Sequence, residues 1–312
     1  MQASVSVSVI VPVFNGAAHL AETLASICAQ TVPVAEVIVV DDGSTDNSIE
    51  IAEHFAPAVR VIVQPNGGVC RARNAGFAAS RGSLVCFVDQ DDIWHPMKLA
   101  RQLAVLAQMP EVGAVVCPYQ HWWPSEQPDA KSAFPPDVGT LLDPAFTGWV
   151  YHQFLLDCWA LTSATLLRRE VVDTCGGFDP AQPYAEDWEL WLRISRTWRF
   201  ALLPWPPVLY RQHTHQGSRQ ARETDHRTAL LLNTASHFGL ASRDGRSIDR
   251  TTFDATLARY QFEFGYHHLQ FGSRAIALQS LMASWWRDPR SWRPLAVALA
   301  GSLGWRPRNN RV

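Results

Sequence analysis

The chain has 312 residues, of which 47% are apolar and 18% charged, so it can bury a substantial core and is not a disordered tail. Its formal net charge of -2 provides no global basic field, and we expect no nucleic-acid partner. The six cysteines lie far apart without a CxxC pair, which indicates free thiols in a reducing compartment. We expect a cytosolic protein, because the N-terminus has no basic leader and no apolar run reaches the roughly 18 residues that span a bilayer.

Strand and helix patterns alternate along the first part of the chain. Continuous apolar runs predict buried strands, and apolar residues three and four positions apart predict helices. The expected strands are residues 5–14, 35–42, 59–64 and 83–89. The expected helices are one capped by Asn15, one capped by Thr45 or Asp46, and two at about 69–80 and 96–108.

This alternation indicates a parallel sheet that is covered by helices on both faces. The carboxyl ends of its strands then lie along one edge, where ligands bind in such folds. We therefore expect the pairs Phe14–Asn15 and Asp41–Asp42 to converge in space with the acidic stretch 89–92.

The second part of the chain is less regular. Residues 118–150 are rich in Pro and aromatics and predict a long loop or insertion. Strand and helix signals return at 159–179, an amphipathic helix is expected at 185–198, and residues 201–218 read as extended. The pattern is helical from about residue 226 to the end.

The acidic stretch "DQDD" follows a predicted buried strand and contains Asp89, Asp91 and Asp92. Carboxylate oxygens in this arrangement suit Mg²⁺ or Mn²⁺, which proteins hold with one or two carboxylates plus substrate phosphates. The alternative is a solvated turn that caps the next helix. A calcium loop is excluded, because Trp94 and Ala100 occupy the positions that would need Gly and Glu.

Two other polar segments lie at the same predicted edge. A carboxylate of the Asp41–Asp42 pair could accept a hydrogen bond from a nucleobase imide N–H or a ribose hydroxyl. The alternative is a strand-to-helix turn in which Asp serves as a cap. The stretch "NGGVCRARNAGF" brings Arg71 and Arg73 into the first turns of a helix, which favours a phosphate or acidic partner. The alternative is that an arginine pairs with Asp89 or with Asp91 to hold the loop. The stretch matches neither a dinucleotide fingerprint nor a P-loop.

Six ordered motifs carry a specific resemblance: "VSVIVPVFNG", "VIVVDDGSTD", "NGGVCRARNAGF", "FVDQDD", "AEDWELWLR" and "YRQHTHQGS". Over residues 5–218 the chain resembles a family 2 glycosyltransferase of the inverting, GT-A type. The resemblance implies an α/β fold with a Rossmann-like, mostly parallel sheet flanked by helices. It implies a catalytic domain over 1–225, with a nucleotide-sugar half of about 1–117 and an acceptor half of about 118–225. A C-terminal helical region, 226–312, would follow.

The resemblance also implies roles for individual residues. The donor nucleotide would contact or be held by Pro12, Phe14, Asn15, Asp41, Asp42, Arg73 and Asp89. Among these, Asp42 would read the base, and Arg73 would steady the phosphate loop. The metal, Mn²⁺ or Mg²⁺, would be held by Asp91, with Asp89 as a metal or ribose contact and His213 as a further metal or diphosphate contact.

An inverting transfer needs a base that takes the proton of the acceptor hydroxyl. We expect Asp187 to be this base, because it lies in the first turn of its helix, where the dipole favours an ionised carboxylate. Glu186 is the competing candidate, and Glu186 and Trp188 are expected to bind the acceptor. The alternative for this motif is a helix cap followed by a core aromatic face.

Residues 284–312 mix Trp and Arg with a single acid and a short apolar helix. This composition suits a peripheral contact with anionic lipid on the inner face of the cell membrane, and the alternative is a helical cap with a basic tail.

The leading hypothesis is a metal-dependent transferase that moves a sugar from a nucleotide-sugar donor, most simply of the UDP type. Its acceptor would be a glycan or lipid-linked glycan, in cell-surface polysaccharide synthesis. The alternative is a non-catalytic nucleotide-sugar binding protein.

Overall fold

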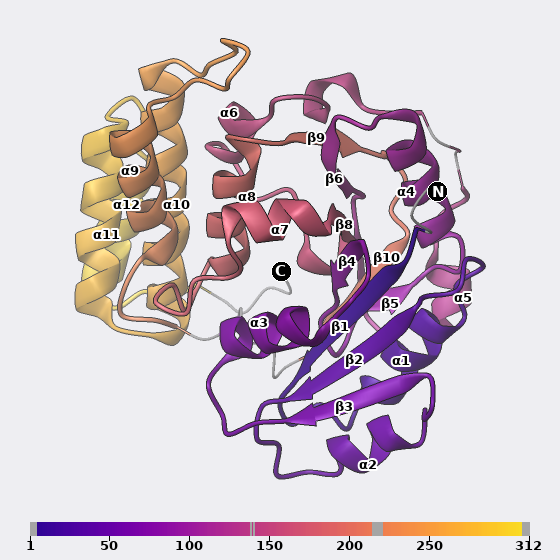
Figure 1. The fold of residues 1–312 in the computed structure, drawn as a ribbon. Helices are drawn as coiled ribbons and strands as arrows, with labels where there is room; N and C mark the ends of the chain where they lie inside the picture. Colours follow the sequence, from indigo (N-terminus) through magenta and orange to yellow (C-terminus); the bar gives the residue numbers. More distant parts are fainter. Residues whose placement is uncertain (1–4, 138, 140, 214–220, 308–312) are drawn as a thin grey trace. The chain divides into compact units, whose positions relative to one another are not determined.

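The computed structural model describes residues 5–137, 139, 141–213 and 221–307. Its contacts divide the chain into two compact units, residues 1–213 and 214–312. The boundary of the catalytic domain near 225, expected from the sequence, stays a prediction. Figure 1 labels the elements of both units.

The first unit contains ten strands in the part of the chain that the structure describes. They are β1 (Val7–Val13), β2 (Glu36–Asp41), β3 (Val59–Val63), β4 (Leu84–Phe87), β5 (Ile93–Trp94), β6 (Val112–Val116), β7 (Gln120–Trp122), β8 (Thr165–Arg168), β9 (Arg199–Leu202) and β10 (Val208–Arg211). Its α-helices are α1 (Leu20–Cys28), α2 (Ser48–Glu53), α3 (Val69–Ala79), α4 (Lys98–Gln108), α5 (Ala130–Ala133), α6 (Tyr151–Phe154), α7 (Arg169–Cys175) and α8 (Glu186–Ser195), with short 3-10 turns η1 (Pro144–Phe146) and η2 (Thr162–Ala164).

Seven strands form the main sheet in the order β3-β2-β1-β4-β8-β6-β9. The pairs β1–β2, β1–β4, β2–β3 and β6–β9 are parallel, and only β8 runs antiparallel to its neighbours. Every residue of β1 is buried, as expected for a central strand with helices on both faces. In Figure 1, α3 and α7 cover the face turned toward the viewer. The predicted mostly parallel sheet is confirmed.

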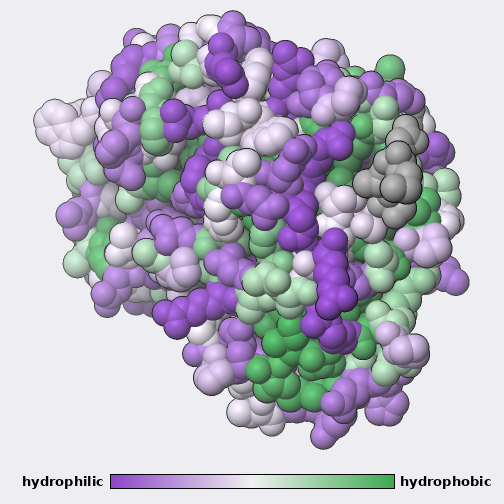
Figure 2. All heavy atoms as spheres, viewed as in Figure 1, coloured by the Kyte–Doolittle hydropathy of each residue, from purple (hydrophilic) through white to green (hydrophobic). Residues whose placement is uncertain are grey.

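The opposite face of the sheet carries the larger core. Apolar side chains of α1 and α4 pack there against alternate residues of β1, β2, β4 and β6, and Leu20, Leu24 and Ile27 form the buried stripe of α1. The edge strand β3 is less covered, and Val63 at its end is 61% exposed. Figure 2 shows the face turned toward the viewer, where apolar side chains gather at the lower centre, at the place of β2 and β3 in Figure 1. The layers leave the carboxyl ends of β1, β2 and β4 as a common edge.

A second, three-stranded sheet in the order β5-β10-β7 joins segments that are far apart in the chain. β10 pairs antiparallel with β5 and parallel with β7. Ile93, Trp122 and Leu209, one from each strand, form a small core with Ala133 of α5. Because β5 follows the acidic stretch directly, this sheet connects that stretch to β10, which ends two residues before His213.

The second unit is helical in its described residues, which confirms the predicted C-terminal helical region. Its helices are α9 (His226–Phe238), α10 (Arg250–Phe271), α11 (Arg274–Arg287) and α12 (Arg293–Ser302). Asp225, Asp249 and Ser273 are N-caps whose side chains accept hydrogen bonds from backbone N–H groups of the first turn. No helix in the described ranges combines the length and apolar character needed to cross a bilayer.

Candidate active site

Asp42 follows β2 directly and is buried, with 3% exposure. Its Oδ1 accepts hydrogen bonds from Gln64 Nε2 at 2.7 Å and Gly67 N at 2.9 Å, and its Oδ2 accepts from Gly68 N at 2.8 Å. Gly68 has φ 85°, a backbone conformation that side chains disfavour, so glycine is suited to aiming this N–H at the carboxylate. A carboxylate has about four acceptor sites, which leaves Asp42 one for a ligand.

The loop after β1 lies against the loop after β2. Asn15 N donates to Ser44 Oγ at 2.9 Å, and Asn15 Oδ1 accepts from Thr45 N at 2.8 Å. Asn15 therefore does not cap the following helix as expected; α1 has His19 at that position, without a side-chain cap. Asn15 instead joins the two loops, and its backbone is left-handed, φ 51°.

The remaining residues predicted to contact the nucleotide lie beside this junction. Pro12 is buried within β1, where it pairs with Val40 of β2, whereas Phe14 is 48% exposed. Asp41 is buried, and its Oδ2 accepts from Gly43 N at 3.2 Å and Ser44 N at 3.1 Å. The exposed Phe14 ring and the buried carboxylates thus form one edge, as the strand alternation predicts.

Arg73 of α3 joins residues from both halves of the predicted catalytic domain. Its Nη2 donates to Asp89 Oδ1 at 2.7 Å, and its Nη1 donates to Glu186 Oε1 at 3.0 Å. Arg73 is 3% exposed, and its Cζ lies 4.7 Å from the centre of the Phe178 ring. The sequence left open that an arginine pairs with Asp89, and Arg73 does so in the structure. The same guanidinium holds Glu186 in an ion pair.

Asp91 and His213 are brought together at a partly exposed position. His213 Nε2 lies 2.9 Å from Asp91 Oδ2, and their side chains are 23% and 18% exposed. A carboxylate and an imidazole are donors that suit Mn²⁺. The described residues contain no group of three or more His, Cys, Asp or Glu that could hold a metal by themselves. Such a pair fits an ion that takes its other ligands from substrate phosphates and water.

Asp92 differs from its two neighbours, because it is fully buried. Burial, together with the charges of Asp91 and Asp89, raises the pKa of Asp92 well above its usual range. The alternative, in which the acidic stretch caps the next helix, does not describe the structure, because α4 begins at Lys98 with Met97 as its N-cap. Asp92 therefore lies in the interior as a group that favours its protonated form.

Asp187 lies in the first turn of α8 and is partly buried. Burial raises the pKa of Asp187 to about 7, the repulsion by Glu186 adds to this, and the Arg73 charge opposes it. The expectation that the helix dipole keeps this carboxylate ionised is therefore corrected, since desolvation and the neighbouring charge outweigh the dipole. A pKa near 7 suits a group that exchanges a proton at neutral pH.

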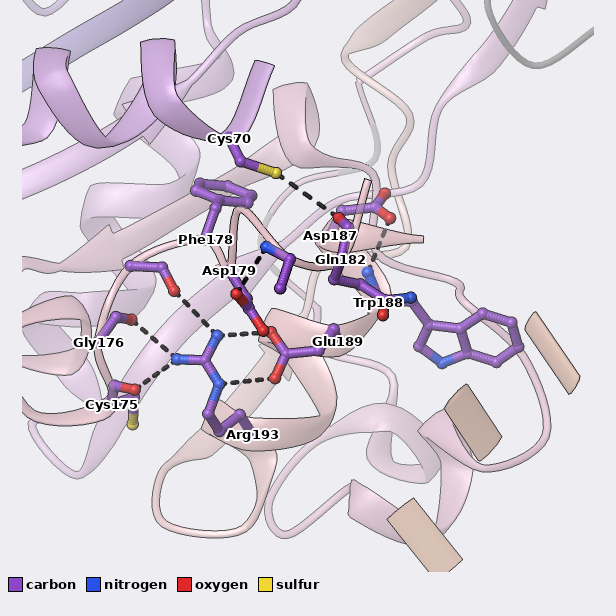
Figure 3. Close-up of polar contacts among 12 residues, drawn as sticks. Cys70, Cys175, Gly176, Phe178, Asp179, Gln182, Asp187, Trp188, Glu189 and Arg193 are labelled. Carbon is purple, nitrogen blue, oxygen red and sulfur yellow. Dashed lines mark hydrogen bonds and ion pairs between the residues drawn. The ribbon is translucent and has the colours of Figure 1, made fainter. Parts of the chain in front are cut away.

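The loop before α8 is fixed by a network that Figure 3 draws. Arg193 of α8 pairs with Glu189, one turn earlier in the same helix. It also donates to the carbonyls of Cys175, Gly176 and Gly177. Asn74 of α3 exchanges two hydrogen bonds with the backbone of Phe178, at 2.7 and 2.9 Å. These contacts hold the loop between α7 and α8, and with it the start of α8.

Trp188 is placed differently from the sequence expectation. It is 2% exposed, and its indole Nε1 donates to Phe154 O at 2.7 Å. A buried ring whose N–H is already hydrogen-bonded offers no surface to an acceptor substrate. Trp188 is therefore part of the aromatic core face, the alternative that the sequence left open. Glu186 is beside the site but is engaged with Arg73.

Sequence reasoning missed residues that complete the site. Gln90 accepts from Phe14 N at 2.9 Å and donates to Phe14 O at 3.2 Å, which joins the acidic stretch to the first loop. Arg211, 3% exposed, donates through Nε to the Asp91 carbonyl at 2.9 Å. The His19 ring lies 4.9 Å from the His213 ring. The signals were present, since Gln90 lies inside the acidic stretch and Arg211 inside "YRQH".

Comparisons of the sequence relate the chain to known glycosyltransferases. The family model described as glycosyl transferase family 2 matches residues 8–160. The chain is 32% identical over 189 residues to an uncharacterized glycosyltransferase of Nostoc sp., covering 59% of this chain and 56% of the relative. It is 33% identical over 192 residues to EpsJ of Bacillus subtilis, covering 58% and 53%. The match thus spans little more than half the length of these relatives.

Solved structures show the same fold. TarS of S. aureus in complex with UDP-GlcNAc superposes with a TM-score of 0.61 at 18% identity, covering 96% of this chain and 87% of that one. The mannosyltransferase PcManGT of Pyrobaculum calidifontis, in complex with GDP-Man and Mn²⁺, gives a TM-score of 0.56 at 22% identity, covering 95% and 79%. These likenesses confirm the predicted GT-A fold.

Proposed function

The chain belongs to glycosyl transferase family 2 through its residues 8–160, and on that premise we propose that it is an inverting, metal-dependent glycosyltransferase. The donor would be a nucleoside diphosphate sugar, and the acceptor a hydroxyl of a glycan or lipid-linked glycan used in cell-surface polysaccharide synthesis. The observation that carries the proposal is the Arg73 ion pair with Asp89 and Glu186, which joins the acidic stretch to the start of α8.

Asp187 is the proposed base. The acceptor oxygen attacks the anomeric carbon of the sugar while its proton passes to the Asp187 carboxylate. The bond from that carbon to the diphosphate oxygen breaks, and the electron pair leaves with the nucleoside diphosphate. The pKa of about 7 supports this role, because Asp187 can accept the proton and release it again near neutral pH. Glu186 is the weaker candidate, since it is ion-paired with Arg73.

Asp91 and His213 would hold Mn²⁺ or Mg²⁺, with Asp89 as a metal or ribose contact. When bound, such an ion neutralises charge on the leaving diphosphate. The protein's own residues position the rest of the donor. Asp42 would accept a hydrogen bond from the base through its remaining site, beside the exposed Phe14 ring.

The donor is proposed to be of the UDP type. Structures of TarS contain UDP and UDP-GlcNAc, whereas PcManGT contains GDP-Man, so the fold accepts more than one base. A thermal-shift panel of UDP-, dTDP- and GDP-sugars with Mn²⁺ would identify the donor class. We expect stabilisation by the UDP-sugars, and stabilisation by the GDP-sugars alone would contradict this choice.

The test of catalysis is release of the nucleoside diphosphate from the donor sugar, measured with Mn²⁺ and with EDTA. We expect release with Mn²⁺ and its loss with EDTA. Binding of the donor without release, or without transfer to any glycan, would favour the non-catalytic binding protein instead. When Asp187→Asn is assayed in the same way, Asp173→Asn is its control. Asp173 is an exposed residue of α7, and its substitution is expected to leave release unchanged.

A further inference from the structure

Helix α12 carries apolar residues on two sides, and one side is covered. Pro294, Ala298 and Gly301 are its buried positions, spaced four and three residues apart. A Cβ on Gly301 would lie 2.8 Å from Leu269 Cδ2, so α12 packs tightly on α10. Ala298 belongs to the same small core as Ala277 and Leu281 of α11. This side of α12 accounts for the folding of the second unit.

The other side of α12, with the residue that flanks it at each end, carries large apolar side chains that no described residue covers. Trp292, Leu299 and Leu303 are 75%, 64% and 81% exposed. They are seven and four positions apart, so at about 100° per residue they lie within roughly 40° of one another around the helix axis. We call these three residues the outer stripe. Single exposed apolar residues are common, but an aligned set on one helix marks an interaction surface.

The neighbouring end of α11 extends the same character. Trp286 is 72% exposed and Met282 is 36% exposed, one helical turn apart. Trp286 and Trp292 flank the turn that connects α11 to α12. Tryptophan in such numbers at a surface is typical of groups that lie at a membrane–water interface, because the ring is apolar and its N–H remains hydrated.

The charges around the outer stripe are almost all positive. Residues 274–307 contain five arginines and one acid, Asp288. Arg274, Arg290, Arg293 and Arg306 are all exposed. Basic residues near an anionic lipid surface are attracted to it and strengthen binding. Since the chain as a whole has a net charge of -2, this concentration of positive charge is local to the α11–α12 hairpin.

We propose that the outer stripe and the arginines around it dock on the surface of an anionic lipid bilayer. The Trp and Leu side chains would enter the region between headgroups and acyl chains, and the arginines would pair with lipid phosphates. The proposal rests on the proposed function in one respect: a lipid-linked acceptor would lie at the same membrane surface. The inference itself depends on α11 and α12 alone and does not require catalysis.

The test is co-sedimentation of the full chain with vesicles of phosphatidylcholine, with and without phosphatidylglycerol. We expect the wild type to sediment with the phosphatidylglycerol vesicles and to stay largely in solution with phosphatidylcholine alone. The triple variant Trp292→Ser, Leu299→Gln, Leu303→Gln should bind the anionic vesicles at least roughly tenfold more weakly than the wild type, because the inserted apolar area is lost. A matched control is Leu141→Gln with Phe238→Ser, which removes exposed apolar residues elsewhere and should bind as the wild type does.

A second variant keeps the proposal testable if the triple variant fails to fold. Arg290→Gln with Arg306→Gln leaves the outer stripe intact and should weaken binding to anionic vesicles only. The proposal is overturned if the wild type ignores anionic vesicles, or if the wild type and both variants bind them equally. It is also overturned if the wild type forms dimers without lipid that the triple variant abolishes, since the stripe then joins two copies. Donor hydrolysis, measured in parallel without lipid, tests the proposed function separately.

Discussion

Asp42, after β2, accepts hydrogen bonds from Gln64 and from two backbone N–H groups, whereas Asp187, at the start of α8, accepts one from the N–H of Trp188. Asp42 is surrounded by donors that stabilise negative charge. Asp187 is desolvated beside another carboxylate, Glu186, and its pKa is raised to about 7. The proposed donor side of the site therefore favours a charged carboxylate, and the proposed acceptor side favours proton exchange. The same residue type serves two purposes because its neighbours differ.

The largest effect is expected when the exchangeable carboxylate is removed. Asp187→Asn should reduce transfer about 10²- to 10⁴-fold, because general-base assistance is lost, while donor binding stays nearly intact. Its thermal stability at pH 8 should equal or exceed that of the wild type, since a raised carboxyl pKa means that ionisation above pH 7 costs the folded state free energy. Transfer rate, donor affinity and melting temperature measure the three parts. Near-normal transfer by Asp187→Asn would break the comparison.

The link between the two sides should be the most costly element for folding. Arg73→Met leaves Asp89 and Glu186 without their shared partner, so we expect a loss of about 3 kcal/mol in the free energy of unfolding. Denaturant unfolding measures this loss. Arg71→Met, an exposed position on the same helix, should change the free energy by no more than about 0.5 kcal/mol. Equal effects of the two changes would show that the buried ion pair does not hold the halves together.

The donor side can be probed by a matched pair of neighbouring acids. Asp42→Asn places an amide N–H₂ against a donor, whichever way the amide turns, so we expect a loss of about 1 to 3 kcal/mol and weaker donor binding. In Asp41 one oxygen, Oδ2, accepts both backbone hydrogen bonds, and Oδ1 has no partner in the described part of the chain. Asp41→Asn should therefore cost less. The reverse order in unfolding and donor titration would contradict this account of the loop.

The donor side could be predicted from the sequence to a greater extent than the acceptor side. β1, β2 and β4 are continuous apolar runs that end in polar residues, so periodicity located both the strands and their edge. β5, β7 and β10 are short strands that pair only through tertiary contacts, and no local pattern indicated their sheet. The same limit applies to side chains. Arg73 and Glu186 are 113 positions apart, and the burial that raises the pKa of Asp92 and Asp187 arises from packing.

The smallest effect, and the sharpest on the acceptor side, is a shift in pH dependence. Transfer should rise with pH through about 7, because a protonated Asp187 cannot accept the acceptor proton and the ionised form predominates only above its pKa. Glu186 repels that ionisation and Asp89 adds weakly, while Arg73 opposes both. Glu186→Gln keeps an oxygen for Arg73 but removes the charge, so the acidic limb of the rate profile should move to lower pH by up to about one unit. Glu170→Gln, an exposed change on α7, should leave the limb in place. A limb that stays fixed in Glu186→Gln would mean that Asp187 does not set the pH dependence, and the difference between the two sides would then not lie in proton exchange.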